Sequence, residues 1–151
     1  MLKAIEEGRS GSSAGAGGPF GVVIVKNGEI IAATHNTVLK DNDPTQHAEI
    51  KAISTASKKL SNYDLSGCEM YSTTEPCPMC FTAIHWARIS RLFYGTDIED
   101  VRELGFNELT IPAGRMKEMG NSPVEVQGGF LRKECEELLK YWETLPDKKV
   151  Y

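Results

Sequence analysis

The chain has 151 residues, a length that suits one domain with a single hydrophobic core. Hydrophobic residues make up 40% and charged residues 25%, as in an ordinary soluble protein, and no apolar run is long enough to cross a bilayer. The N-terminus lacks the apolar segment of a secretory signal, so we expect a cytoplasmic protein without membrane contact. The net charge of −4 and the pI of about 5.4 argue against a large nucleic-acid surface.

The first third of the chain predicts a helix, a loop and a β-hairpin, in that order. Residues 2–7 are expected to form a short helix, and the Gly- and Ser-rich stretch 8–18 is expected to be a flexible surface loop. Residues 20–36 predict the hairpin, because two β-branched, apolar runs flank Asn27 and Gly28. That pair is a strong signal for a two-residue turn between antiparallel strands.

A helix is expected over residues 45–60, after a polar loop. Asp43 or Thr45 is the expected N-cap, because either side chain can accept a hydrogen bond from a free backbone N–H of the first turn. Pro44 suits the same turn, where its missing N–H costs nothing. A second helix is expected over 76–88, and it also opens with a proline.

The other predicted elements alternate between strand and helix. In chain order they are a strand at 68–74, a strand at 90–96, a short helix at 97–104, a strand at 123–127 and a helix at 130–143. Residues 107–121 give no prediction. The last helix has apolar residues at helical spacing, which predicts one packed face. These residues are Leu131, Cys135, Leu138, Leu139 and Trp142. The alternation predicts a single α/β layered domain over residues 1–151.

The stretch TTEPCPMC places Cys77 and Cys80 three positions apart. This spacing suits a redox pair, half of a structural zinc clamp, or a catalytic metal site. A structural zinc site usually has four Cys or His ligands, but the chain has no second closely spaced cysteine pair. Cys68 and Cys135 lie in apolar sequence and are expected to be small buried hydrophobes. Three good ligands with an open fourth position are typical of catalytic zinc.

His47 is the expected third ligand, and it stands two residues before Glu49. The combined pattern His-x-Glu…Pro-Cys-x-x-Cys is the signature of zinc-dependent deaminases. His47 and Glu49 can reach one metal only if it lies near the first turn of their helix, since two residues diverge by about 200° around a helix axis. One carboxylate can act in turn as base for a metal-activated water and as acid for a departing amine. We therefore expect Glu49 to be the proton shuttle.

Three stretches resemble the cytidine deaminase superfamily, and within it they are most similar to the bacterial guanine deaminases. They are GGPFGVVIVKNGEIIAATHN, NDPTQHAEIKAI and STTEPCPMCFTAIHWARISRLFYG. The resemblance implies a three-layer α/β/α fold with a five-stranded mixed sheet, in a homodimer. In the bacterial guanine deaminases the C-terminal segment, here about 129–151, is exchanged between subunits and helps to close the active site.

The resemblance also implies roles for individual residues. It identifies His47, Cys77 and Cys80 as the ligands of one Zn²⁺ per subunit, with a water as the fourth ligand, and Glu49 as the proton shuttle. Glu108, in the stretch Gly-Phe-Asn-Glu, matches an acidic residue that contacts the base and assists proton transfer. The preceding Asn107 departs from the acid that the family usually has there.

Four further residues match positions that contact the substrate, and each has an alternative role. Asn36 matches an amide that hydrogen-bonds the purine, but an Asn at a strand end is also a common turn residue. Phe20 and Trp86 match aromatics of the pocket, and either is equally suited to ordinary core packing. Tyr151 matches a terminal tyrosine that reaches into an active site, and its alternative is a disordered tail end.

The implied reaction is the hydrolysis of guanine to xanthine and ammonia. A tRNA adenosine deaminase shares the metal motif, but it typically has a basic C-terminal helix, whereas KYWETLPDKKVY mixes acidic residues with its lysines. Cytosine, isocytosine or ammeline are alternative small substrates. A non-catalytic zinc module that binds a partner is a different class of function, and the presence of Glu49 argues against it. We expect a small-molecule nucleobase as the partner, and no nucleic acid.

Overall fold

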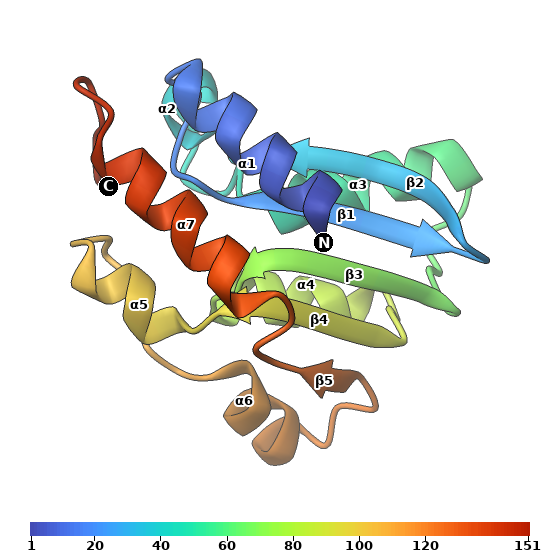
Figure 1. Cartoon of the computed structure of the whole chain (residues 1–151). Coiled ribbons are helices and arrows are strands. Elements are labelled where there is room, and N and C mark those ends of the chain that lie inside the picture. The colour runs from blue at the N-terminus through green and yellow to red at the C-terminus, as the bar shows by residue number, and fades with distance from the viewer.

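The computed structural model describes residues 1–151 and contains a five-stranded mixed sheet with the strand order β2-β1-β3-β4-β5 (Figure 1). The strands are β1 (Gly21–Lys26), β2 (Glu29–His35), β3 (Cys68–Thr74), β4 (Arg91–Thr96) and β5 (Glu125–Gln127). The helices are α1 (Leu2–Ser13), α2 (Val38–Asp41), α3 (Ala48–Leu60), α4 (Pro78–Trp86), α5 (Ile98–Glu103), α6 (Ala113–Gly120) and α7 (Arg132–Glu143).

The sheet lies between two layers of helices. Helices α1 and α7 cover one face, and α3 and α4 cover the other (Figure 1). Strand β1 pairs antiparallel with β2 and β3, while β3, β4 and β5 run parallel. The three-layer α/β/α fold with a mixed sheet is therefore confirmed. None of the helices has both the length and the apolar character needed to traverse a lipid bilayer.

The predicted hairpin is confirmed, and its turn explains the residues found there. Asn27 and Gly28 both have positive φ, at 51° and 81°. A two-residue turn whose central residues both have positive φ matches the right-handed twist of the strands it joins, and Asn-Gly adopts it readily. The hairpin therefore leads the chain from β1 straight into β2, which ends next to the start of the polar loop before α3.

The main hydrophobic core lies between the sheet and the layer formed by α3 and α4. It contains 17 buried residues. Ala48, Ala52 and Ala56 occupy one face of α3 at four-residue spacing and are fully buried. Because alanine has the smallest side chain that still favours a helix, α3 can lie close to the sheet. This packing fixes the start of α3 relative to β2 and β3.

The glycine-rich N-terminal stretch is helical for longer than predicted. Helix α1 runs to Ser13, so the expectation of a short helix over 2–7 followed by a loop was wrong for residues 8–13. Gly8 and Gly11 are buried, and a Cβ atom on Gly11 would overlap the imidazole ring of His35. These glycines allow α1 to approach β1 and β2 closely, and composition alone does not distinguish this use from flexibility.

Helices α3 and α4 begin later than predicted. Helix α3 begins at Ala48 rather than 45, because the Asp43 side chain accepts the Thr45 N–H at 2.8 Å and holds Pro44 in a separate turn. Helix α4 begins at Pro78 rather than 76. A residue before proline avoids the helical region, so Cys77 is extended. The N-cap residues are therefore His47 and Cys77, not the predicted Asp43 or Thr45.

Two helices of the structure were not predicted from the sequence. Helix α2 falls in the predicted polar loop, and α6 falls in the stretch 107–121 that gave no prediction. Leu131 was predicted to share the packed face of the last helix, but it precedes α7 in the left-handed region, with φ of 51°. The other four apolar residues of that face are buried as predicted. Cys68 and Cys135 are buried thiols, also as predicted.

The C-terminal segment packs on its own chain. Helix α7 lies against α1 and β4, and the tail beyond it returns to the end of the sheet. Val101, Phe106 and Trp142 form a second small core there, and the partly buried Tyr151 packs against it. The exchange of residues 129–151 between two subunits stays a prediction.

Candidate active site

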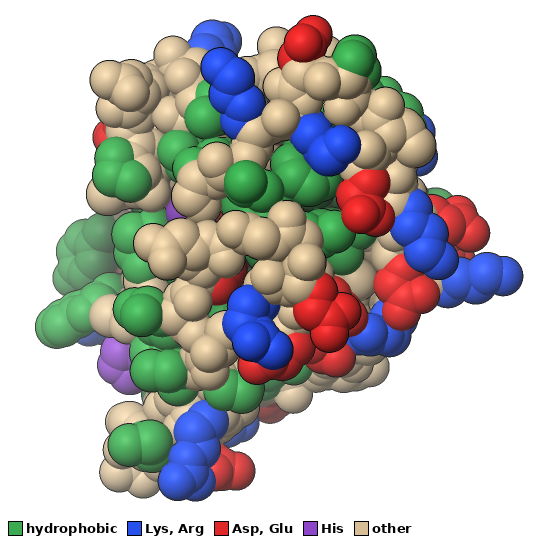
Figure 2. Space-filling model, turned by 90° about the vertical axis from the view of Figure 1, so that its left-hand side faces the viewer, with side chains coloured by type: hydrophobic (Ala, Val, Ile, Leu, Met, Phe, Trp, Pro, Cys, Tyr) green, Lys and Arg blue, Asp and Glu red, His purple; other side chains and the backbone are tan.

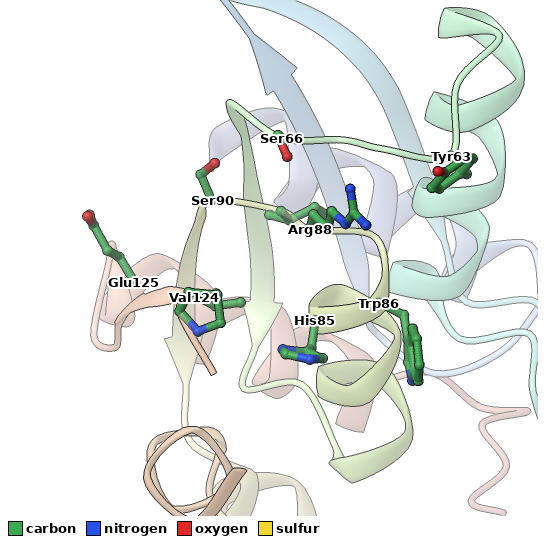
Figure 3. Close-up of a pocket in the computed structure, with 10 residues that line it drawn as sticks. Tyr63, Ser66, His85, Trp86, Arg88, Ser90, Val124 and Glu125 are labelled. Carbon is green, nitrogen blue, oxygen red and sulfur yellow. The ribbon is translucent and has the colours of Figure 1, made fainter. Parts of the chain in front are cut away.

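A cavity of about 740 Å³ lies near the C-terminal end of α4, and it is the place where the structure puts Trp86. The indole is 76% exposed and shares this cavity with Tyr63, His85 and Arg88 (Figure 3). No set of three metal-ligating side chains lines it. Trp86 is therefore not brought together with the other predicted site residues within one chain.

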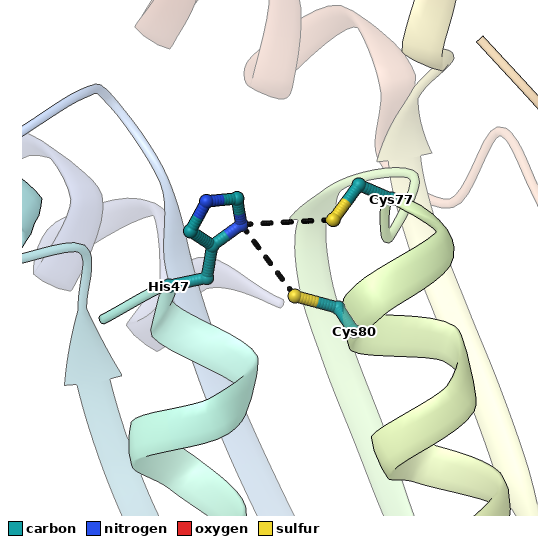
Figure 4. A group of neighbouring side chains, drawn as sticks. All are labelled: His47, Cys77 and Cys80. Carbon is teal, nitrogen blue, oxygen red and sulfur yellow. Dashed lines mark hydrogen bonds between the residues drawn. The ribbon is translucent and has the colours of Figure 1, made fainter. Parts of the chain in front are cut away.

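The predicted metal ligands meet where two helices begin. His47 is the N-cap of α3, Cys77 is the N-cap of α4, and Cys80 is the third residue of α4 (Figure 4). Both caps have extended backbone, which turns their side chains across the helix starts toward one another. The structure therefore brings together side chains 30 and 33 positions apart in sequence.

The distances within this cluster suit a tetrahedral zinc ion. His47 Nδ1 lies 3.7 Å from Cys77 Sγ and 3.5 Å from Cys80 Sγ, and all three ligand atoms lie within 4.8 Å of one another. Zinc bonds of about 2.0 Å to nitrogen and 2.3 Å to sulfur at a tetrahedral angle place the two ligand atoms about 3.5 Å apart. One imidazole and two thiols on this geometry form a donor set that fits zinc and leaves a fourth position for a small ligand.

The electrostatics of the cluster favour a thiolate at Cys77. The hydrogen bond from Cys80, together with the contact to His47, lowers the pKa of Cys77 to about 4 against the opposing effect of burial. Burial acts to lower the pKa of His47, but the hydrogen bond to Cys77 and the charge of Glu49 together raise it to about 9. The positive N-terminal ends of α3 and α4 also favour the thiolate form, because they stabilise negative charge on the sulfur atoms. Metal ions bind the deprotonated thiol, so the site is prepared for one.

Glu49 is the second residue of α3 and lies beside the metal ligands. It is only 7% exposed, and the Ser72 hydroxyl of β3 donates a hydrogen bond of 3.4 Å to its Oε1. Burial raises the pKa of this carboxyl group, because the charged form loses hydration. A carboxyl group with a raised pKa holds a proton more readily than an exposed one, which suits a group that accepts and returns protons.

Glu108 reaches the same cavity from the loop between α5 and α6. Burial, followed by the negative charge of Cys77, raises its pKa to about 7. The neighbouring Asn107 N–H donates a 3.1 Å hydrogen bond to the backbone oxygen of Tyr151. The structure thus places a second carboxyl group with a raised pKa opposite the start of α3.

The cavity between these groups is small, about 20 Å³, which is room for roughly one water molecule. It is lined by Phe20, Asn36, His47, Glu49, Ser72, Thr74, Glu75, Cys77 and Glu108. Six of the sequence-predicted site residues are in this set, and Cys80 adjoins it through the metal cluster. The candidate site is therefore small, polar and rich in titratable groups, as active sites are.

Asn36 is fully buried, and its amide has a fixed orientation. Its Oδ1 accepts the Val38 N–H at 3.1 Å and the Tyr151 hydroxyl at 2.7 Å, while that hydroxyl accepts the Gly18 N–H at 3.0 Å. The Asn36 Nδ2 has no hydrogen-bond partner. Because a buried donor without a partner costs about 1–3 kcal/mol, this N–H group indicates a place for an acceptor on a ligand.

The comparisons with known proteins agree with this geometry. Residues 1–96 match the family described as the cytidine and deoxycytidylate deaminase zinc-binding region. This chain belongs to that family.

Several deaminases resemble the chain over nearly its whole length. The guanine deaminase of Bacillus subtilis is 41% identical over 154 residues, which cover 100% of this chain and 96% of that protein. The tRNA-specific adenosine deaminase of the same organism is 34% identical and covers 99% of this chain and 90% of its own. The solved guanine deaminase from Nitrosomonas europaea is 32% identical, with a TM-score of 0.85 over 94% of this chain and 81% of its own.

Three residues of this deaminase cavity had no predicted role: Ser72, Thr74 and Glu75. Ser72 and Thr74 point from β3 toward the site, and no local pattern separates them from other strand residues. Glu75 is adjacent to the Pro-Cys-Pro-Met-Cys motif, which is the only sequence signal it offers. These residues reach the cavity because the fold places the end of β3 beneath it.

Proposed function

We propose that this deaminase hydrolyses guanine to xanthine and ammonia. The observation that carries the proposal is the buried carboxylate of Glu49 beside a three-ligand set, His47, Cys77 and Cys80, that fits zinc. The 41% identity to a guanine deaminase along the whole chain supports guanine as the substrate. The net reaction consumes one water and exchanges the amino group of the base for a carbonyl oxygen.

The proposal includes one zinc ion per subunit, with a water as its fourth ligand. His47, Cys77 and Cys80 would hold the ion, and two thiolates would balance its charge. Zinc bound in this way lowers the pKa of water from about 15.7 toward 7, which makes it a nucleophile at neutral pH. The remaining work falls to the side chains of the cavity.

Glu49 has the position and the pKa for two proton transfers in sequence. As a carboxylate it accepts one proton from the attacking water and delivers it to the ring nitrogen. It then accepts the remaining proton of the added hydroxyl group and delivers it to the departing amine, which leaves the carbonyl oxygen on the ring. Its burial supports both steps, because a raised pKa makes the carboxylate a stronger base for the proton of the water. Glu108 assists as a second acid, and its pKa of about 7 suits that task.

Asn36 and Phe20 are the proposed contacts to the base. The free Nδ2 of Asn36 donates to an acceptor atom on the purine, and its orientation is held by the two donors already bound at Oδ1. Phe20 lines the same cavity and packs edge-on against Phe106, with ring centroids 5.1 Å apart. A flat base fits an aromatic wall of this kind.

Binding of a purine requires the cavity to open. A volume of about 20 Å³ is far below that of typical ligand pockets, which begin at about 300 Å³. The tail and the loop lie behind the lining of the cavity, because Tyr151 bonds to Asn36 and Phe106 packs on Phe20. The ring centroids of Tyr151 and Phe106 lie 5.3 Å apart. We propose that these two elements move outward to admit the base and then close on it.

A tRNA adenosine deaminase is the alternative favoured by a specific observation, the 34% identity to such an enzyme. Figure 2 shows the end of the molecule where β3 and β4 finish, and basic and acidic side chains are interspersed on it. A polynucleotide is better held by a continuous basic surface. The mixed charges and the partly buried Tyr151 support a small free base, and cytosine, isocytosine and ammeline belong to the same class.

We also propose that the protein is a homodimer in which residues 129–151 are exchanged between subunits. The proposed reaction would place the enzyme in purine metabolism, in the cytoplasm. The segment joins the rest of the fold through α7 and Tyr151, and an exchanged segment would make the same contacts from a second chain. Light scattering on the purified protein measures the subunit number. A monomeric mass at the concentration of the activity assay would contradict the dimer.

A panel assay of ammonia release tests the proposed substrate. The purified zinc protein is incubated with guanine, adenine, cytosine, isocytosine, ammeline, cytidine and a tRNA, and xanthine is measured in the guanine reaction. We expect ammonia and xanthine in equal amounts from guanine, and a kcat/KM at least about tenfold lower for every other compound. Turnover of tRNA or a nucleoside without turnover of guanine would overturn the proposal.

A further inference from the structure

Glu75 is a buried carboxylate with an unusual pair of partners. Its side chain is 6% exposed, Oε2 accepts the N–H of Ile98 at 3.0 Å, and Oε1 accepts the N–H of Ala113 at 2.8 Å. These donors are the first residues of α5 and α6, so one side chain joins the starts of two different helices. No Lys, Arg or His side chain forms an ion pair with Glu75, and the two backbone N–H groups are its direct partners.

The two helices held by Glu75 flank the loop that carries Glu108. Helix α5 ends at Glu103 and α6 begins at Ala113, so the loop spans the residues between them. Both ends of the segment formed by α5 and this loop, Ile98 and Ala113, therefore meet at the same carboxylate. Glu75 itself is fixed at the end of β3, because its own N–H donates to the carbonyl of Thr96 at 2.8 Å.

The position of Glu75 also connects this segment to the metal ligands. It lies two residues before Cys77 in the turn that leads into α4. A movement of Glu75 would change the distance between that turn and the loop, and hence the position of Glu108 relative to the zinc ligands. Burying a carboxylate costs several kcal/mol of folding free energy unless it is fully hydrogen-bonded. An apolar side chain would fill the same space without that cost, so the hydrogen bonds of Glu75 are the reason for a carboxylate at this position.

We propose that Glu75 is a positioning residue that holds Glu108 over the metal site by joining the starts of α5 and α6. This inference rests on the proposed function, because it concerns a proton donor for deamination. A carboxylate presents two acceptor oxygens, as the two N–H donors require.

The variant Glu75→Gln tests the proposal with almost no change in shape. Its carboxamide keeps one acceptor oxygen but presents an N–H₂ group to the other backbone donor, so one of the two helix starts is released. We expect kcat for guanine to fall about 10- to 100-fold, because a displacement of about 1 Å can cost about 10²-fold in rate. We expect KM to change less than about threefold and the zinc content to equal that of the wild-type protein.

A double variant separates positioning from a general loss of structure. If Glu75 acts through Glu108, then adding Glu75→Gln to Glu108→Ala lowers kcat by less than about threefold. Additive losses would overturn the proposal, and so would a loss of zinc from Glu75→Gln in proportion to its activity. The control is Glu103→Gln, the same substitution at an exposed position of α5, which is expected to leave kcat unchanged.

Hydrogen exchange gives a readout that does not depend on activity. Amides of residues 105–111 are expected to exchange at least about tenfold faster in Glu75→Gln, while those of α3 keep their wild-type rates. Unchanged exchange over 105–111 would overturn the proposal. If Glu75→Gln is insoluble, Glu75→Asp must give the same pattern, since its shorter side chain cannot span both donors. A wild-type protein that releases no ammonia refutes the proposed function, and the exchange rates still decide the role of Glu75.

Discussion

Two cavities in this protein differ in almost every property. The one beside α4, lined by Trp86 and Tyr63, has a volume of about 740 Å³, while the one at the starts of α3 and α4 has a volume of about 20 Å³. The larger cavity contains one histidine, one arginine and one glutamate at its edge, with no group of metal-ligating side chains. The smaller one contains the three carboxyl groups of Glu49, Glu75 and Glu108, a low-pKa thiol and an unpaired amide donor.

The comparison shows that the titratable and metal-ligating groups gather where the backbone brings helix starts and strand ends together, and not in the cavity with the larger volume. Two helix starts and two strand ends converge on the smaller cavity, and each supplies a polar group that the fold holds in place. The larger cavity lies at the opposite end of α4, where the helix has finished and its last residues face solvent. Matched substitutions in the two cavities therefore measure how far the functional groups are confined to the smaller one.

The largest difference is expected between His47→Ala and His85→Ala. The first variant loses a zinc ligand, and guanine turnover should fall on the order of 10⁴-fold or more, because water without the metal is a very weak acid. The second removes a histidine of the larger cavity and is expected to keep wild-type turnover. Metal analysis and initial rates measure both effects. Full zinc content in His47→Ala would contradict the assigned ligand set.

A large effect is also expected for Glu49→Ala, compared with Glu125→Ala in the larger cavity. Removal of the proton shuttle should lower kcat by about 10²- to 10⁴-fold while zinc stays bound, since positioned acid–base groups contribute that much. Glu125 is exposed, and its removal is expected to leave kcat unchanged. Wild-type rates in zinc-loaded Glu49→Ala would show that another group moves the protons.

A moderate effect is expected for Glu108→Gln, on the pH dependence of kcat. Glu108 has a pKa of about 7, so it is protonated below that pH and ionised above it. If it donates a proton, kcat should decline as the pH rises through about 7, and Glu108→Gln should be slower but without that decline. Rates from pH 5.5 to 9 under saturating guanine measure the profile. A decline that persists unchanged in Glu108→Gln would assign it to a different group.

The smallest effect is expected for Tyr151→Phe, compared with Tyr63→Phe. Loss of the Tyr151 hydroxyl removes a donor to Asn36 and an acceptor for Gly18, and about 1 kcal/mol of lost orientation should raise KM about fivefold. Tyr63 is 74% exposed in the larger cavity, and its variant should keep the wild-type KM. Equal KM values for both variants would show that the terminal tyrosine does not orient the amide.

The sequence determined the features that depend on residues close together in the chain. The Asn27-Gly28 turn, the strand at 68–74 and the apolar face of the last helix follow from local preferences, and the structure contains all three. The ligand set was also readable, because the spacing of His47, Cys77 and Cys80 is a chemical pattern in itself. Resemblance to a known family then supplied Asn36, Phe20, Glu108 and Tyr151.

Only the tertiary structure decided what depends on distant segments meeting. The buried glycines of α1 allow close packing on the sheet, but in the sequence they look only like the composition of a loop. The start of α6 is held by a carboxylate 38 residues earlier in the chain. The placement of Trp86 away from the metal ligands of its own chain follows from where α4 ends, which sequence spacing does not give. The physical reason is the same in each case: local preferences act over a few residues, whereas packing and buried hydrogen bonds join segments whose separation in sequence carries no information.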